Sequence, residues 1–187
     1  MTNASDNSPI LSGAEGRGLG GFGVIFLIGF MGSGKTYWGK IWAHQMGLDF
    51  YDLDEIIEQN EKRSIAETFE KEGEKYFRKI ETVALHRFSK IENAVIACGG
   101  GTPCFNANMQ WMNENGITVY LSATPQYILS RIKEEKDKRP LINKLNEAEL
   151  LFFIEQKLKE REPFYSQAKI ILPVTDLHEN NLSTLNS

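Results

Sequence analysis

The sequence contains few of the residues that mark disulfide-bonded, zinc-binding or membrane-spanning proteins. Its 187 residues include two cysteines, Cys98 and Cys104, which lie close together at an expected strand end and loop. We therefore expect no disulfide framework. Three scattered histidines supply no Cys/His zinc cluster. The longest apolar run, from Val24 to Met31, is interrupted by Gly29 and is too short to span a bilayer.

An excess of positive charge is also missing. The formal net charge is -4 and no basic run stands out, so we expect no nucleic-acid partner. Residues 1–21 are rich in Gly, Ser and Asn and lack a cationic segment followed by an apolar one. We expect a flexible leader rather than a signal peptide, and a cytoplasmic location. Residues 22–176 have about the length of one domain, and residues 177–187 are expected to form a polar tail.

Short apolar runs that alternate with helical patterns indicate the fold class. Residues 24–28 are continuously apolar and rich in β-branched side chains, which is typical of a strand buried on both faces of a parallel sheet. Further strands are expected at residues 49–53, 94–97, 117–121 and 169–172. Because helical patterns separate these strands, the sequence predicts an α/β sandwich around a parallel sheet.

Several residues predict where the helices begin and end. Gly47 is expected to end the first helix. Ser64 and Glu67 have the spacing of a capping box. The Thr124-Pro125 pair is typical of the first positions of a helix, and residues 146–149 can cap a long helix that reaches Arg161.

One glycine-rich segment follows the first buried strand and precedes a helix. Residues 29–36 read Gly-Phe-Met-Gly-Ser-Gly-Lys-Thr, which matches the phosphate-binding P-loop pattern in its specific context. The backbone N–H groups of such a loop surround an anion at a helix N-terminus. Lys35 supplies a positive charge for the β and γ phosphates, and the Thr36 hydroxyl can bind magnesium. The sequence therefore predicts a P-loop protein that uses ATP with Mg²⁺.

The rest of the chain distinguishes among P-loop proteins. Residues 143–146, Asn-Lys-Leu-Asn, lack the aspartate of a guanine-binding signature and follow no apolar strand, which argues against a GTPase. Residues 133–146 are dense in charge and contain Pro140, so we expect a mobile lid that closes over ATP and excludes water. Arg139 in this segment either contacts the transferring phosphoryl group or is one of several solvated charges. This organisation favours a small-molecule kinase.

Two carboxylates lie at the end of the second expected strand, the edge at which ligands bind in open α/β sheets. Because side chains alternate along a strand, Asp52 and Asp54 are expected to point the same way. One can serve magnesium, directly or through water, and the other can accept a proton from a substrate hydroxyl. Asp54 can alternatively be a helix N-cap.

Two arginines and a run of three glycines are further candidates on the acceptor side. Arg78 and Arg161 are widely separated, and each alone is more often structural or solvated. If they converge, their planar guanidinium groups can bind a carboxylate. Glycines at 99–101 directly follow a buried strand, which indicates close approach of a ligand to the backbone, with a plain turn as the alternative.

Taken together in order, these segments resemble the shikimate kinase family over about residues 22–172. Each segment alone is a weak signal, but six in order form a specific match. The matching segments are Gly-Phe-Met-Gly-Ser-Gly-Lys-Thr at 29–36, Phe-Tyr-Asp-Leu-Asp at 50–54, Glu-x-x-Phe-Arg at 74–78, Gly-Gly-Gly at 99–101, Arg-Pro-Leu at 139–141 and Arg-x-Pro-x-Tyr at 161–165. The resemblance implies a nucleoside monophosphate kinase-like P-loop NTPase fold. This fold is a three-layer α/β/α sandwich around a five-stranded parallel sheet, usually monomeric.

The resemblance also implies an activity, the ATP-dependent phosphorylation of the 3-hydroxyl of shikimate in aromatic amino-acid biosynthesis. By position, Asp54 holds the reacting hydroxyl and acts as its base. Arg78 and Arg161 bind the shikimate carboxylate, and the backbone of Gly100 contacts the substrate. The catalytic residues implied are Asp54, Lys35 and Arg139.

The resemblance implies a donor site as well. Thr36 would bind magnesium, with Asp52 behind a bridging water. The implied ATP-binding residues are Gly32, Ser33, Gly34, Lys35, Thr36, Tyr37 and Arg139. The chain departs from the family at Tyr37, because a small residue usually follows the loop Ser or Thr. We therefore expect activity with altered nucleotide affinity.

Two other functions remain as alternatives. The first is a kinase of another small polyol acid, such as gluconate, although the set of Asp54, Arg78 and Arg161 suits a hydroxylated ring that bears a carboxylate. The second is a nucleotide-binding module without catalysis, to which Tyr37 alone points. The intact lysine, hydroxyl and carboxylate pair argue against the second.

Overall fold

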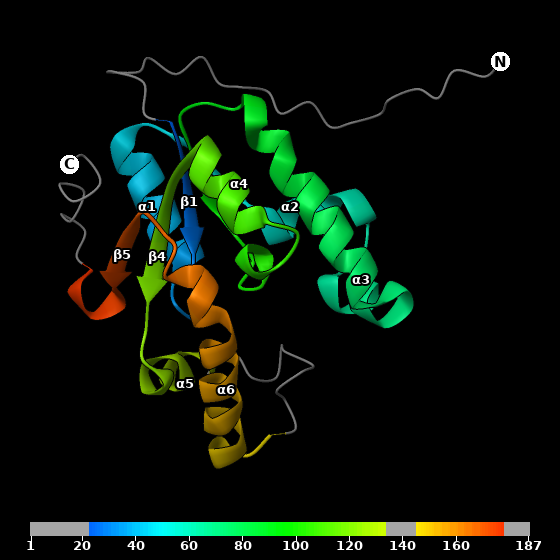
Figure 1. Cartoon of the computed structure of the whole chain (residues 1–187), viewed down its shortest axis with the longest axis vertical. Coiled ribbons are helices and arrows are strands. Elements are labelled where there is room, and N and C mark those ends of the chain that lie inside the picture. Colours follow the sequence, from blue (N-terminus) through cyan, green and yellow to red (C-terminus); the bar gives the residue numbers. More distant parts are fainter. Residues whose placement is uncertain (1–22, 134–144, 178–187) are drawn as a thin grey trace.

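A parallel sheet of five strands forms the centre of the computed structural model, which describes residues 23–133 and 145–177 (Figure 1). The strand order is β2-β3-β1-β4-β5, and every neighbouring pair is parallel. All five strands agree with the predicted positions to within a few residues. Their bounds are β1 Val24–Ile28, β2 Asp49–Asp52, β3 Ala94–Ala97, β4 Gly116–Ser122 and β5 Ile170–Pro173.

Helices connect the strands, and several of them begin or end at the residues that the sequence predicts. The Ser64–Glu67 and Asn146–Glu149 capping boxes are both formed. Gly47 ends the first helix at a φ of 66°, which suits glycine. The helices are α1 Lys35–Met46, α2 Leu53–Glu61, α3 Ile65–His86, α4 Asn108–Asn115, α5 Pro125–Lys133 and α6 Glu147–Tyr165, with short 3-10 turns η1 Arg87–Lys90, η2 Thr102–Cys104 and η4 Val174–Asp176.

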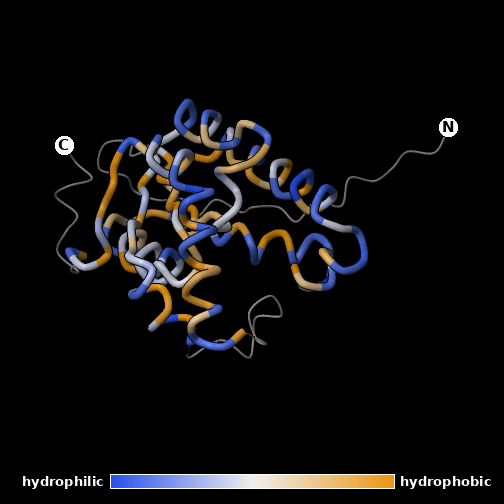
Figure 2. Tube along the Cα trace, turned by 60° about the horizontal axis from the view of Figure 1, so that its bottom comes forward, coloured by the Kyte–Doolittle hydropathy of each residue, from blue (hydrophilic) through white to orange (hydrophobic). Residues whose placement is uncertain are grey.

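The alternation of side chains along β1 divides the core into two parts. Phe26 and Ile28 pack on one face of the sheet in a cluster with residues of α2, α3 and α4. Ile25 and Leu27 pack on the other face against α1 and the segment after β5. The resulting layers, helix, sheet and helix, confirm the predicted three-layer α/β/α sandwich (Figure 1). In Figure 2 hydrophilic residues mark many of the outer turns of the helices, and many hydrophobic residues lie toward the middle of the molecule.

The prediction for the end of β2 was wrong in its geometry. The strand stops at Asp52, and α2 begins at Leu53, so Asp52 and Asp54 do not alternate along one extended segment. Asp52 is the N-cap, since its carboxylate accepts a hydrogen bond from the Asp54 N–H at 3.1 Å. Asp54 is therefore in the first turn of the helix, and Asp52 caps it.

The remaining predictions concern the cysteines, membrane-spanning helices and the segments at the two ends and in the expected lid. Cys98 and Cys104 are both free, as expected. Among the described residues no helix has the length and apolar character needed to cross a membrane. The leader, most of the expected lid including Arg139, and nearly all of the tail lie outside the residues that the structure describes.

Candidate active site

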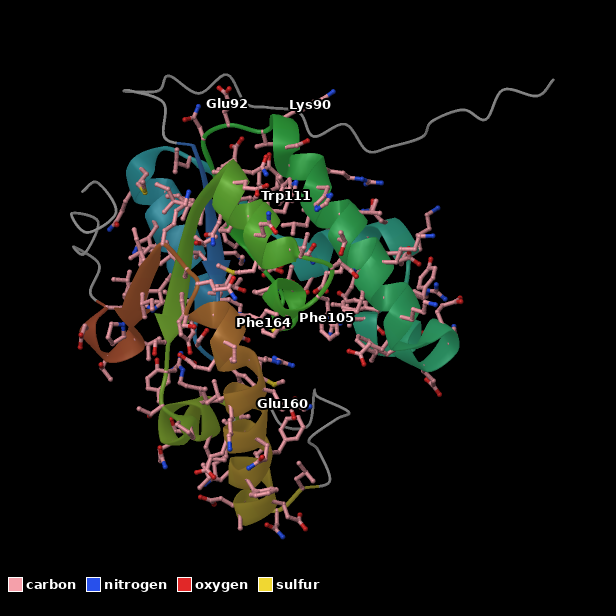
Figure 3. The ribbon with its side chains drawn as sticks, in the orientation of Figure 1. Lys90, Glu92, Phe105, Trp111, Glu160 and Phe164 are labelled. Carbon is pink, nitrogen blue, oxygen red and sulfur yellow. The ribbon has the colours of Figure 1, made fainter. Side chains whose placement is uncertain are left out.

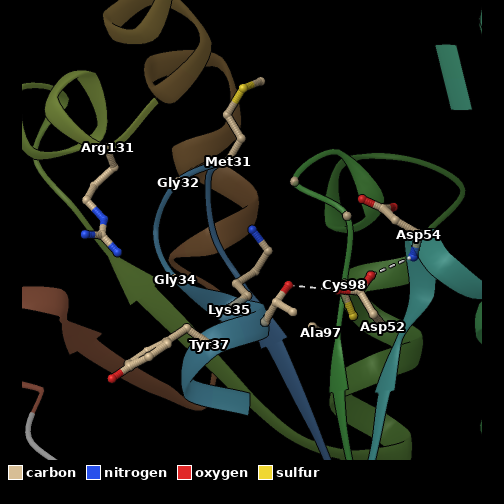
Figure 4. Close-up of a pocket in the computed structure, with 13 residues that line it drawn as sticks. Met31, Gly32, Gly34, Lys35, Tyr37, Asp52, Asp54, Ala97, Cys98 and Arg131 are labelled. Carbon is tan, nitrogen blue, oxygen red and sulfur yellow. Dashed lines mark hydrogen bonds between the residues drawn. The ribbon is translucent and has the colours of Figure 1, made fainter. Parts of the chain in front are cut away.

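The phosphate-binding loop connects the carboxyl end of β1 to α1. Gly32 has a φ of 79° and Gly34 a φ of 90°, a region that favours glycine over other residues. The loop lines a pocket of about 360 Å³ at the carboxyl edge of the sheet (Figure 4). This pocket is lined by Met31, Gly32, Gly34, Lys35, Thr36, Tyr37, Asp52, Asp54, Ala97, Cys98, Gly99, Gly100 and Arg131.

Lys35 begins α1 and lies over the loop. Its ammonium donates to the Gly29 carbonyl at 2.9 Å and to the Phe30 carbonyl at 3.0 Å. Loss of hydration among the surrounding protein atoms lowers the pKa of Lys35 to about 8, and the negative charge of Asp54 opposes this shift. A bound anion would favour the charged form of this lysine. The loop is therefore arranged to receive negative charge.

Ser33 is the predicted ATP-binding residue, among those described, that does not line the pocket. Its side chain is fully buried, and its N–H donates to the Phe30 carbonyl at 3.2 Å. Within the described residues its hydroxyl has no hydrogen-bond partner. Ser33 thus belongs to the inner side of the loop, whereas Gly32, Gly34, Thr36 and Tyr37 face the pocket.

Thr36, Asp52 and Asp54 form a connected group beside the lysine. The Thr36 hydroxyl donates to Asp52 Oδ2 at 2.8 Å, while Asp52 Oδ1 accepts from the Asp54 N–H (Figure 4). Partial burial, followed by repulsion from Asp52, raises the pKa of Asp54 to about 6, and Lys35 opposes the shift. The predicted metal-binding pair and the predicted base are therefore neighbours, although they reach this position through a helix start rather than a strand.

The three glycines after β3 make room for the three predicted acceptor side chains. A Cβ atom would lie 2.8 Å from Asp54 Oδ1 at the first glycine, 3.0 Å from Arg161 Nη1 at the second and 2.6 Å from Arg78 Nη1 at the third. Any larger residue would displace these groups. Side chains of α2, α6 and α3 can therefore approach residues 99–101 closely. The need for this space explains why glycine occurs three times here.

Arg78 is held on two sides in α3. Its Nε and Nη2 donate to Glu74 Oε1 at 3.2 and 3.1 Å, and its Nη1 donates to Glu81 Oε2 at 2.9 Å. Glu81 is buried and also accepts from the Thr102 hydroxyl at 2.7 Å, whereas Glu74 is largely exposed. The guanidinium lies 4.2 Å from the ring centroid of Phe105, which follows η2 between α3 and the end of α6 (Figure 3). The exposed side of Arg78 is therefore the side that a ligand can reach.

Arg161 approaches from the last turns of α6. Its guanidinium lies 5.1 Å from the ring centroid of Phe30 in the phosphate loop, so it is close to both the loop and Gly100. Arg78 and Arg161 do not line the phosphate-loop pocket itself; Arg78 lines a second pocket together with Glu74 and Phe105. The two arginines flank the glycine run, as a shared carboxylate partner would require.

Sequence reasoning assigned no role to three residues at this site. Arg131 of α5 lines the pocket on the same side as Tyr37, which is 56% exposed (Figure 4). Glu81 holds Arg78, and its spacing of three residues on one helix is a signal that could have indicated it. Tyr165 donates to the Gly100 carbonyl at 2.5 Å. For Arg131 and Tyr165 only the folded chain reveals the contact.

A phosphate loop that faces a carboxylate and two guanidinium groups across one sheet edge places this protein in the class of P-loop kinases. A family model described as shikimate kinase matches residues 31–184. The chain is 42% identical over 155 residues to a shikimate kinase of Phocaeicola vulgatus, covering 83% of this chain and 89% of the relative. The chain belongs to the shikimate kinase family.

Solved structures agree with this assignment. A shikimate kinase from Bacteroides thetaiotaomicron has a TM-score of 0.83 at 38% identity, covering 88% of this chain and 98% of that one. A shikimate kinase from Acinetobacter baumannii, solved in complex with shikimate, has a TM-score of 0.76 at 33% identity and covers 88% and 90% of the two chains. The predicted five-stranded P-loop fold is thereby confirmed.

Proposed function

We propose that this chain transfers the γ-phosphoryl group of ATP to the 3-hydroxyl of shikimate, giving shikimate 3-phosphate and ADP in aromatic amino-acid biosynthesis. One observation carries the proposal. Residues 99–101 place Asp54, Arg161 and Arg78 around one backbone segment beside the phosphate loop. A hydroxylated ring that bears a carboxylate supplies a partner for each of these groups, and a relative was solved with shikimate bound.

On the donor side, the phosphates of ATP are proposed to occupy the pocket lined by Gly32, Gly34 and Lys35. The backbone amides at the start of α1 and the Lys35 ammonium would stabilise the charge that develops on the transferring group. Tyr37 and Arg131 lie where they can contact the rest of the nucleotide. Arg139 remains a proposed contact of the phosphoryl group, from a segment outside the described residues.

Magnesium is proposed to bind at Thr36, with Asp52 behind a bridging water. A hydroxyl and a carboxylate are oxygen ligands of the type that Mg²⁺ prefers, and the two are joined at 2.8 Å at the edge of the pocket. In the described part of the chain no group of three or more His, Cys, Asp or Glu side chains can hold a metal. This fits an ion held largely by phosphate and water. When bound, it would neutralise charge on the phosphate oxygens.

On the acceptor side, Asp54 is proposed to orient the 3-hydroxyl and to accept its proton. A carboxylate with a pKa of about 6 is ionised at neutral pH yet more basic than an ordinary aspartate. Arg78 would exchange its exposed partner Glu74 for the shikimate carboxylate while keeping buried Glu81. An exposed ion pair is worth little, so this exchange costs little. Arg161 of α6 would bind the same carboxylate from the other side of the glycine run.

A coupled ADP-release assay with shikimate, quinate and gluconate tests the proposal. We expect turnover with shikimate and much less with the other two, because quinate has a different ring and gluconate has none. A folded protein that binds ATP but does not turn over shikimate would overturn the proposal. Turnover of gluconate alone would favour a kinase of another polyol acid, and ATP binding without any turnover would favour a non-catalytic module.

The organisation of the protein is also a proposal. We propose that residues 22–176 act as one catalytic domain and that the protein is a cytoplasmic monomer. Light scattering during size-exclusion chromatography tests the oligomeric state, since a monomer of this chain has a mass of 21.2 kDa.

A further inference from the structure

The last residue of α6 contacts the middle glycine of the acceptor segment. Tyr165 is fully buried, and its hydroxyl donates to the Gly100 carbonyl at 2.5 Å. Its ring packs on Tyr120 of β4, with ring centroids 4.9 Å apart. The hydroxyl is thus fixed by a packed, buried ring at the end of α6, which supports a backbone segment that is not itself in a helix or strand.

The glycine run needs such a support. Glycine has more backbone freedom than any other residue, so consecutive glycines can rotate the peptide groups between them at low cost. Among the described residues, the N–H groups of Gly100 and Gly101 have no hydrogen-bond acceptor. Across a planar trans peptide the C=O and the next N–H point in opposite directions. Holding the Gly100 carbonyl toward Tyr165 therefore also fixes the direction of the Gly101 N–H.

Tyr165 acts at the point where the two sides of the site meet. A Cβ at Gly100 would lie 3.0 Å from Arg161 Nη1, 3.4 Å from the Gly29 carbonyl oxygen and 3.6 Å from the Met31 nitrogen. Arg161 is one helical turn before Tyr165 in α6. Burial raises the pKa of Tyr165 to about 12, with the Arg161 guanidinium opposing the shift, so the phenol stays protonated and can donate.

We propose that Tyr165 is a positioning residue for the acceptor: its hydroxyl holds the Gly100 carbonyl against α6 and thereby fixes the orientation of the peptide between Gly100 and Gly101, whose N–H is available to the substrate. This inference rests on the proposed function. Tyr165 touches no substrate in this scheme and acts through Gly100. Loss of the phenolic oxygen alone would remove the hydrogen bond to the Gly100 carbonyl and leave the ring in place.

The test compares Tyr165→Phe with Tyr120→Phe. Both tyrosines belong to the same ring pair, and each substitution removes one hydroxyl, but Tyr120 donates to exposed Glu162 at 3.1 Å and not to the glycine run. For Tyr165→Phe we expect a rise of about tenfold in the shikimate KM, the effect of one lost hydrogen bond, with the dissociation constant for ADP unchanged. For Tyr120→Phe we expect wild-type shikimate KM.

A second measurement does not depend on activity. The Thr102 N–H donates to the Gly99 carbonyl at 3.0 Å across the glycine run, so its hydrogen exchange in the free protein should be at least severalfold faster in Tyr165→Phe than in wild type and Tyr120→Phe. Equal shikimate KM and equal exchange in the two variants would overturn the inference, whatever their melting temperatures. If the wild-type protein itself fails to phosphorylate shikimate, the proposed function fails, and the exchange comparison still decides whether Tyr165 holds the glycine run.

Discussion

The donor and acceptor sides of this site are built in different ways. The centre of the donor side is one continuous segment, residues 29–37, in which backbone conformation and a helix start create the anion site. The acceptor side is assembled from α2, α3 and α6, whose side chains converge on residues 99–101. On the donor side most contacts come from the backbone and the main side-chain contribution comes from Lys35, whereas the assembled acceptor side depends on each of its members. The two sides should therefore respond differently to substitution.

The two sides also carry ionisable groups of opposite charge, Lys35 on the donor side and Asp54 on the acceptor side. The pKa of Lys35 on the donor side is lowered to about 8, and that of Asp54 on the acceptor side is raised to about 6. In each case burial is the largest cause, and each group partly counteracts the shift of the other. The charged forms of both groups are thus less stable than in water, which is typical of residues prepared for catalysis. Variants of these two residues should have the largest effects.

Lys35→Met should have the largest effect of all. Removing the only side-chain cation that the phosphate loop itself carries is expected to lower kcat by about 10³-fold or more, because this charge acts on the transferring group. The control is Lys40→Met, on the same helix, whose exposed ammonium lies 5.6 Å from the centroid of the Phe50 ring. Steady-state kinetics with saturating shikimate measure both. A kcat for Lys35→Met within tenfold of wild type would contradict the assignment of the donor side.

Asp54→Asn should come next, with a loss of about 10²- to 10⁴-fold in kcat, the usual contribution of a positioned general base. The dissociation constant for ADP should stay within about twofold, since Asp54 acts on the acceptor. Isothermal titration with ADP provides that comparison. If kcat and ADP affinity fell equally, Asp54 would be a structural residue and the distinction between the two sides would fail at this position.

The two arginines should have a smaller effect, on shikimate binding. Replacement of either Arg161 or Arg78 by lysine is expected to raise the shikimate KM by about 10- to 100-fold, because lysine loses the planar fork that binds a carboxylate. ADP affinity should not change. Exposed Arg87 supplies the control, Arg87→Lys, with no expected change in either quantity.

Thermal unfolding separates the roles of the two arginines. Arg78 is paired with Glu81, whose side chain is 1% exposed, and a poorer partner leaves a buried carboxylate less compensated. Arg78→Lys should therefore lower the melting temperature more than Arg161→Lys. Equal melting temperatures would show that the buried Glu81 carboxylate does not need the Arg78 guanidinium to compensate its charge.

The different construction of the two sides also explains what the sequence could predict. The phosphate loop of the donor side was predictable because its residues are contiguous and their order is specific, whereas Arg131 of α5 was not predicted. The capping boxes at Ser64 and Asn146 were predictable for the same reason. On the acceptor side each residue type could be proposed, but the contacts of Glu81 and Tyr165 come from packing between distant segments. The error at Asp52 and Asp54 arose because a strand and an N-cap look alike over two residues.

The last expected effect is on stability, and its sign is opposite to the effect on activity. In the absence of magnesium and nucleotide, Asp54→Asn should raise the free energy of unfolding by about 1–3 kcal/mol at pH 7.5. The reason is that the folded protein raises the pKa of Asp54 from 3.8 to about 6, so the ionised carboxylate is less favourable in the folded state than in the unfolded chain. An amide removes that penalty.

The pH dependence of this gain follows from the same shift. The wild-type carboxyl contributes stability below pH 3.8, where it is protonated in both states, and this contribution is lost as the pH rises through about 6. The advantage of Asp54→Asn should accordingly shrink between pH 6 and pH 4, as denaturant unfolding at several pH values can show. Glu55→Gln, an exposed carboxylate in the same helical turn, is the control and should give no gain. A pH-independent gain would mean that packing at residue 54, and not its charge, limits the stability of the acceptor side.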